Sequence, residues 1–418
     1  MKHLLPFTTI TTLVVLAISV SAGTADDPAT NNIEALTLEQ AWDVAERLQP
    51  ELAEAKALID AAEARAKQAG LFPNPAAIAR MESARFDGRT TGQAEYLAGI
   101  SQPIPLGNRL SKARQAELLE RARRSKELEV HRRNLRRRVH SAFATALYQE
   151  QAFEKQNEIA ASVEKVAATT KARVDAGDAA REDLARAEME LVRAKVELRR
   201  SEAMREHAMV ELKAAMGDPH LSIRTLAGKL EATFEIPALE TLAAELSTHP
   251  EVALAATEVR ARQARVDLAK AERIPDVRAE LLYRRLEASK ESSFDVGVSI
   301  PLPLFDRNQG RLRKARAEVA AAEARSRSMQ NSLRVRLHEA HARLTGALAN
   351  SRDLKNEVLP RAETVLKAVE ARYSAGDISL NEAMPVRRDW AAMQLSYLEA
   401  LRDVMQAWVE VRALALAN

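Results

Sequence analysis

The chain has 418 residues, no cysteine and little aromatic content, and its 62 Lys and Arg residues nearly balance its 59 Asp and Glu residues. The lack of cysteine excludes disulfides, thiolate metal sites, cysteine nucleophiles and a lipid on an N-terminal cysteine. A composition rich in Ala, Leu, Arg and Glu, with few Gly and Pro, predicts long helices. The near-balanced charge gives no reason to expect nucleic acid as a partner.

The N-terminus has the pattern of an export signal, which we predict over residues 1–22. A basic start is followed by an apolar stretch at 10–20, and small residues at 20–22 fit a cleavage site after Ala22, with Ala25 as the alternative. The apolar stretch is too short to span a membrane, which takes about 20 residues. No later segment is apolar for long enough either, so any membrane-spanning part is expected to be a β-barrel.

The rest of the chain reads as two copies of one unit. We place the first repeat at 36–217 and the second at 240–416, with a linker at 218–239. Each copy has the same order: a helix opened by a Pro-Glu pair, an extended region, a long helix, an Ala-Gly-Asp turn and a return helix. A period this long indicates a duplicated architecture.

The helical segments are unusually long. Residues 108–175 contain neither Pro nor Gly, which predicts roughly 100 Å of helix. The second copy runs over 310–375, where Pro360 predicts a kink or a break. The return helices are expected at about 179–216 and 379–416. Their stripes of Ala, Leu and Val are narrow, which favours coiled-coil packing.

Each copy carries an Ala-Gly-Asp turn between its long helix and its return helix. The glycines are expected to take the left-handed conformation that ends a helix, and the aspartates to cap the next helix. Each turn is therefore predicted to be the tip of a helical hairpin. The residues concerned are Arg173, Gly177 and Asp178 in the first copy and Arg372, Gly376 and Asp377 in the second.

Two extended regions are predicted, at about 76–104 and 277–302. In the second, Phe294, Val296, Val298 and Ile300 alternate with Asp295, Gly297 and Ser299. Apolar-out, polar-in alternation is typical of transmembrane barrel strands, and it fits a soluble hairpin equally well. Two hairpins give only four strands, so a barrel would have to be shared by several copies of the chain.

Other patterns carry little chemistry. His338 and His341 share one helical face and are weak candidates for a metal site, but no third ligand is evident and a polar helix surface is the simpler interpretation. The basic run at 132–138 is interpreted as a solvated face or as inter-helix ion pairing. No phosphate loop, nucleophile elbow or metal-ligand cluster is present, so we expect neither an enzyme nor a cofactor.

Residues 36–416 resemble the TolC-like outer-membrane efflux family in the duplicated order, in the two turns and in the motif at 212–217. The motifs at 68–75, 101–107 and 301–310 are similar to the CzcC/CusC branch, which is linked to heavy-metal cation export. The resemblance implies a mainly helical fold with a small β portion. Duplicated helical hairpins would form a periplasmic coiled-coil tunnel. Four strands per protomer would enter a twelve-strand barrel shared by a homotrimer in the outer membrane.

The resemblance also implies a function and partners. The chain would be the exit duct of a tripartite efflux system, with a periplasmic adaptor protein, an inner-membrane resistance-nodulation-division pump and outer-membrane lipid as partners. The alternatives are a duct for drug efflux or type I secretion, or a periplasmic coiled-coil scaffold without a channel. Relatives often carry a lipidated cysteine, which this chain lacks.

The candidate site residues lie at the hairpin tips. The resemblance places Glu382, with Asp183 as its first-copy counterpart, at the pore constriction, where carboxylates would favour cations. The alternative is that both are helix-start acids favoured by the helix dipole. Arg173 and Arg372, with the glycine and aspartate of each turn, would dock the adaptor. For the arginines, the alternative is a basic residue favoured at a helix C-terminus.

Overall fold

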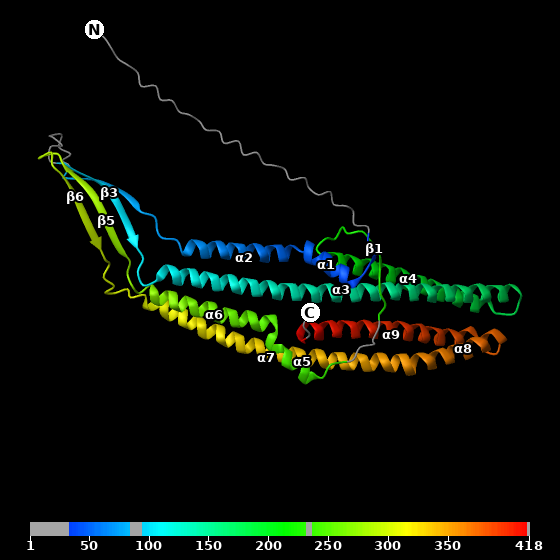
Figure 1. Ribbon diagram of the computed structural model, residues 1–418. Helices are drawn as coiled ribbons and strands as arrows, with labels where there is room; N and C mark the ends of the chain where they lie inside the picture. Colours follow the sequence, from blue (N-terminus) through cyan, green and yellow to red (C-terminus); the bar gives the residue numbers. More distant parts are fainter. Residues whose placement is uncertain (1–32, 84–93, 231–235, 416–418) are drawn as a thin grey trace, which may run out of the picture.

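The computed structural model describes residues 33–83, 94–230 and 236–415. The predicted signal at 1–22 and its cleavage site lie outside these residues. The molecule is elongated, with a four-stranded sheet at one end, helical hairpin tips at the other and long helices between them (Figure 1). Within the described residues, no helix combines the length and apolar character needed to cross a membrane.

The two repeats have the predicted order of elements. The first contains α1 (Leu38–Leu48), α2 (Pro50–Ala69), β2 (Ala76–Glu82), β3 (Glu95–Ile104), α3 (Arg109–Asp175) and α4 (Arg181–Ala215). The second contains α5 (Leu239–Glu245), a 3-10 turn (Leu246–Thr248), α6 (Pro250–Ala271), β5 (Val277–Leu286), β6 (Ser292–Ser299), α7 (Gln309–Asp353), α8 (Leu359–Ala375) and α9 (Leu380–Ala415). The expectation of a mainly helical fold with a small β portion is confirmed.

The hairpins of the two repeats join in one antiparallel sheet of order β2-β3-β5-β6. At its centre Gly99 of β3 lies opposite Leu282 of β5. A Cβ on Gly99 would lie 2.0 Å from the carbonyl oxygen of Leu281, so only glycine fits this crossing. Within the described residues, β2 and β6 each pair along one side only, and the sheet has two open edges.

The two faces of the sheet differ as the alternation in β6 predicts. Phe294 lies opposite Tyr283 and Val296 opposite Leu281, and these apolar side chains are exposed. On the other face Arg284 forms ion pairs with Asp295, at 2.6 Å, and with Glu95. One face is therefore apolar and open, and the other is charged and internally paired.

Part of the predicted linker, residues 218–230, contains regular structure. Its strand β4 (Ile223–Leu226) pairs in parallel with β1 (Ile33–Leu36), just before the first repeat. Leu36, Leu221 and Leu230 are buried in the core cluster that includes Leu135 of α3. Residues 218–230 thus pack against the start of the described chain. Sequence periodicity could not show this, because the two strands are each four residues long and lie far apart in the chain.

The helices bury narrow stripes of small residues and connect through ion pairs. The basic run of α3 pairs with three other helices: Arg132 with Glu46 of α1 at 3.1 Å, Arg138 with Glu51 of α2 at 2.7 Å, and Arg137 with Glu410 of α9 at 2.8 Å. Glu51 has a pKa below its usual value, mainly because it accepts hydrogen bonds from Arg138. The interpretation of this run as inter-helix ion pairing is confirmed.

The two Ala-Gly-Asp turns have the same backbone geometry. Gly177 and Gly376 have φ of 85° and 83°, the left-handed conformation that ends a helix. The backbone N–H of Asp178 donates to the carbonyl of Arg173 at 2.7 Å, and that of Asp377 to the carbonyl of Arg372 at 2.9 Å. The predicted hairpin tips are therefore present in both copies.

One detail of these turns was predicted wrongly. The aspartates do not cap the next helix, because α4 begins after Ala180, without a side-chain capping bond, and α9 begins after Ser379. The backbone N–H of each aspartate closes the turn instead.

The predicted irregularity near Pro360 is a π-helical turn. Leu354–Val358 forms it between α7 and α8, and Pro360, which has no backbone N–H to donate, lies two residues beyond it in the first turn of α8. The helical path from α7 to α8 therefore continues, with one wide turn immediately before the proline.

A buried histidine of α3 lies against α9. His140 is 8% exposed, and burial, with Arg136 and Arg412 nearby, lowers the pKa of its imidazole to about 4. The folded protein therefore holds a neutral imidazole at pH values where an unfolded chain would protonate it.

We expect His140 to make the fold sensitive to acid. Because its folded pKa lies below the unfolded value, stability is complete above about pH 6.5 and falls as the pH drops toward 4, by up to roughly 3 kcal/mol. Urea unfolding of the detergent-solubilised protein at several pH values measures this. His140→Gln should flatten the pH dependence between 6.5 and 4, and an unchanged slope in that variant would contradict the assignment.

Candidate functional site

The two hairpin tips lie side by side at the end of the molecule farthest from the sheet (Figure 1). The α3/α4 hairpin contacts the α8/α9 hairpin through a small apolar cluster. Its buried members are Ala160, Val163, Ala167, Ala187, Ala194, Leu380 and Met384, and partly buried Val166, Leu191, Leu198 and Tyr373 pack against them. Most of the buried members are alanines, so the hairpins approach closely but bury little apolar area. Such a contact is weakly held, because the hydrophobic contribution follows the buried area.

Polar contacts supplement this small cluster at its outer end. The hydroxyl groups of Thr170 in α3 and Tyr373 in α8 are 3.0 Å apart. The Arg173 guanidinium lies over the Tyr373 ring, 5.5 Å from its centre. Arg173 and Tyr373 lie at the ends of the two hairpins. Tyr373 therefore connects the first hairpin tip to the second. The sequence comparison missed Tyr373, because the first copy has Val174 at the matching position.

Two further arginines on α9 connect the hairpins deeper in the bundle. Arg387 forms a hydrogen bond with Ser162 of α3 and an ion pair with Glu370 of α8. Arg388 pairs with Glu190 of α4 at 3.3 Å. Each of these arginines therefore joins α9 to the first hairpin, and any separation of the two hairpins has to break these contacts.

Glu382 lies exposed in the first turn of α9. Its carboxylate accepts hydrogen bonds from the Ser379 hydroxyl at 3.1 Å and from the Ser379 backbone N–H at 3.4 Å. This is the reciprocal half of a capping box, so Glu382 has a local role at the helix start. One carboxylate oxygen accepts both bonds, and the side chain keeps its exposure at the tip end of the molecule.

Asp183 occupies the matching place in the first turn of α4 and is half-buried. The two acids therefore lie at the same end of the molecule, as the sequence predicted. The tip arginines differ between the copies, because Arg173 is half-buried against Tyr373 whereas Arg372 is exposed. Gly177, Asp178, Gly376 and Asp377 are all exposed at the tips.

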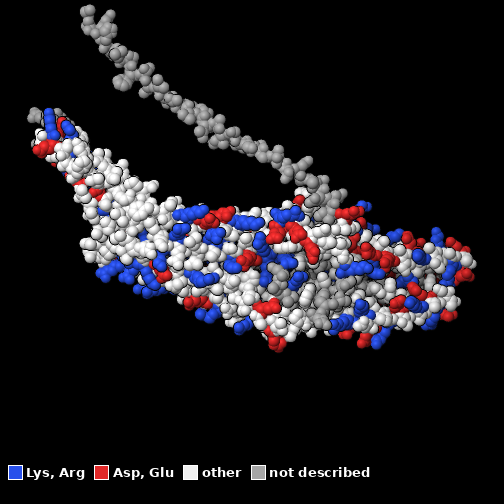
Figure 2. Space-filling model, in the orientation of Figure 1, with Lys and Arg blue, Asp and Glu red and all other residues white. Residues whose placement is uncertain are grey.

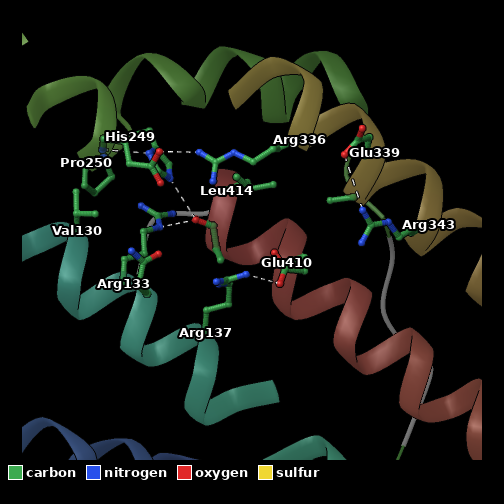
Figure 3. Close-up of a pocket in the computed structure, with 14 residues that line it drawn as sticks. Val130, Arg133, Arg137, His249, Pro250, Arg336, Glu339, Arg343, Glu410 and Leu414 are labelled. Carbon is green, nitrogen blue, oxygen red and sulfur yellow. Dashed lines mark hydrogen bonds and ion pairs between the residues drawn. The ribbon is translucent and has the colours of Figure 1, made fainter. Parts of the chain in front are cut away.

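A cavity between α3, α6, α7 and α9 has a charged lining (Figure 3). Arg133 donates to the carbonyl of Ala413 at 2.6 Å, and His249 lies 3.3 Å from the same oxygen. Arg336 pairs with Glu251 at 2.6 Å. Arg133 and His249 contact a carbonyl at the C-terminal end of α9, and Arg336 joins α7 to α6, so we interpret this cavity as a structural contact between the helices.

The weak metal candidates gain no support. His338 is exposed and His341 half-buried on α7. Among the residues that the structure describes, no group of three or more His, Asp or Glu side chains is arranged to hold a metal ion.

Comparison with known proteins defines the family. The chain matches the family described as outer membrane efflux protein over residues 43–218 and 242–415. The cobalt-zinc-cadmium resistance protein CzcC of Cupriavidus metallidurans is 29% identical over 372 residues, which cover 89% of this chain and 88% of that protein.

Solved structures share the fold. A membrane protein from Pseudomonas aeruginosa superposes with a TM-score of 0.78 at 20% identity, covering 90% of this chain and 92% of that one. CusC superposes with a TM-score of 0.74 at 15% identity, covering 91% and 92%. The predicted resemblance is confirmed, and the chain belongs to the outer membrane efflux protein family, a family of outer-membrane channels.

Proposed function

We propose that the protein is the exit duct of a tripartite efflux system. Its helices would extend into the periplasm and meet an adaptor protein, and an inner-membrane resistance-nodulation-division pump would supply the energy. The proposal rests on the difference between the two ends of the molecule. One end has a sheet with two open edges and one apolar face, and the opposite end has the paired hairpin tips.

The open edges support a homotrimer. Unpaired backbone groups are costly within a membrane, so β2 of one copy would pair with β6 of the next until the sheet closes. Three copies would give twelve strands, and the charged face around Arg284 would then line the interior. The two tips of each copy would ring the periplasmic mouth, where Arg372 and the exposed turn residues are available to an adaptor.

We further propose heavy-metal cations as the exported substrates. The similarity to CzcC, which is named for cobalt, zinc and cadmium resistance, supports this class. At the mouth, Glu382 and its counterpart Asp183 would form a ring of carboxylates that attracts cations and repels anions. The exposure of Glu382 is compatible with this role, and its bonds to Ser379 fix where the charge lies.

Glu382→Gln tests the carboxylate ring. Glutamine keeps the acceptor that Ser379 needs, so the helix start is retained while the charge is lost. We expect the concentration of divalent cation that half-blocks the wild-type channel to rise about tenfold, which corresponds to about 1.4 kcal/mol. Single-channel conductance in a planar bilayer measures this.

Asp183→Asn is the matched variant in the first copy, and it should have a smaller effect. If the same concentration of divalent cation half-blocks the wild type and Glu382→Gln, Glu382 does not line the constriction. Absence of any conductance from a membrane-inserted oligomer, with and without an adaptor, would contradict the duct itself.

The contacts between hairpins give a second prediction. Tyr373→Phe removes the hydroxyl group that meets Thr170, and Arg388→Gln breaks the pair with Glu190. If these contacts hold the tips together, the double variant should show higher conductance, with a stability loss of only about 1 kcal/mol.

Arg361→Gln is the control for this double variant. Arg361 pairs with Glu357 one turn away at 2.8 Å, inside the same hairpin, so its loss breaks an ion pair without freeing the tips. A similar rise in conductance in Arg361→Gln would show that the effect is not specific to the contacts between hairpins.

A further inference from the structure

The start of α7 carries a basic surface next to the sheet. From 307 to 316 the chain has Arg307, Arg311, Arg313, Lys314 and Arg316 and no acid. Figure 2 shows Lys and Arg side chains gathered at this end of the helices, beside the largely uncharged surface of the sheet. An open hollow here is lined by Arg273, Arg307, Arg313 and Arg316, together with Leu304 and Phe305.

The arginines that line the hollow differ from two basic neighbours on α7. Arg311 and Lys314 lie near carboxylates, at 3.7 Å from Glu272 and 3.9 Å from Glu318. Within the described residues, Arg273, Arg307, Arg313 and Arg316 form no ion pair, and all four are exposed. The hollow therefore has a concentration of positive charge without a counter-charge.

The helix itself adds to this charge. A helix N-terminus has a partial positive charge, and acidic residues are normally favoured there. α2, α4, α6 and α9 follow that rule, each with an acid in its first turn, whereas α7 has none. α3 also lacks one, but its Arg109 pairs with Asp276 at 2.8 Å. At the start of α7, Arg307, Arg313 and Arg316 form no ion pair among the described residues, and this arrangement suits an external anion.

The apolar side of the hollow continues the open face of the sheet. Phe294, Val296 and Val298 of β6 are 68–79% exposed. The same alternation runs past the end of the strand through Ile300 and Leu302 to Leu304, all at least half exposed, and Phe305 is 91% exposed. In a protein of the outer membrane, this face meets lipid, so lipid contact extends from the strand to the edge of the basic hollow.

We propose that this hollow binds an anionic phospholipid. The guanidinium groups of Arg313 and Arg316, with Arg273 and Arg307, would hold the phosphate, and an acyl chain would lie along Leu304 and Phe305. Arginine suits this role because its planar group donates two hydrogen bonds to a phosphate. A lipid accounts for both halves of the site, whereas carboxylates from a neighbouring copy would account only for the charge. The site rests on the family's location in the outer membrane and not on the exported substrate.

Native mass spectrometry of the full chain in detergent tests the proposal. The probes are phosphatidylglycerol, the zwitterionic phosphatidylcholine and inorganic phosphate. We expect the wild type to retain phosphatidylglycerol in preference to phosphatidylcholine, and Arg313→Gln with Arg316→Gln to lower that retention about tenfold. Phe305→Ser, which keeps every arginine, should also lower it.

Arg327→Gln with Arg334→Gln is the matched control, because both residues are exposed arginines of the same helix, about 16 Å or more beyond Arg316. Equal loss in the control would mean nonspecific charge and would overturn the site. Equal retention of phosphatidylcholine, or full displacement by inorganic phosphate, would also overturn it. If Arg313→Gln with Arg316→Gln loses the oligomer but keeps the same amount of lipid per chain, the arginines hold copies together and the lipid site is overturned.

Discussion

The open edges of the sheet are the constraint on which the rest of this structure depends. β2 and β6 each present a row of backbone N–H and C=O groups that have no strand partner among the residues that the structure describes. In water such edges promote aggregation, and in a lipid environment each unpaired group costs several kcal/mol. A single copy is therefore an incomplete unit, and a closed ring of copies such as the proposed trimer would pair every edge. The apolar face, from Phe294 to Phe305, is placed where such an assembly meets lipid.

The helical part of the molecule also buries little apolar surface. Stripes of Ala and Leu let the helices approach closely and leave their wide charged faces exposed, so ion pairs between helices set how the bundle fits together. At the tips even less is buried, and the contacts of Tyr373, Arg387 and Arg388 supplement a cluster whose buried members are mostly alanines. A region held by few and mainly polar contacts is one that can move at modest cost. Such a region suits the mouth of a channel that opens and closes.

Much of this architecture could be predicted from the sequence, because it rests on local patterns. The duplicated order, the strand alternation around Val296 and the left-handed glycines at 177 and 376 follow from period, residue type and turn chemistry. The pairing of β1 with β4 and the contact of Thr170 with Tyr373 did not emerge, because each depends on how elements are placed in three dimensions. The bond of Glu382 to Ser379 is local, and the sequence indicated only a general helix-start role for this acid. The aspartates of the turns were misassigned for a similar reason: a capping residue and a turn residue look alike until the first residue of the helix is known.

A cross-linking experiment between copies tests the central claim most directly. The chain has no cysteine, so Ala79→Cys in β2 can be combined with a cysteine at 294, 296 or 298 in β6 without interference. Within one copy these strands are three strand spacings apart, roughly 14 Å, which is too far for a disulfide. We expect at least one pair to give covalently linked dimers and trimers, and nothing larger, after mild oxidation in membranes. Single chains alone at all three positions would contradict the pairing of open edges between copies.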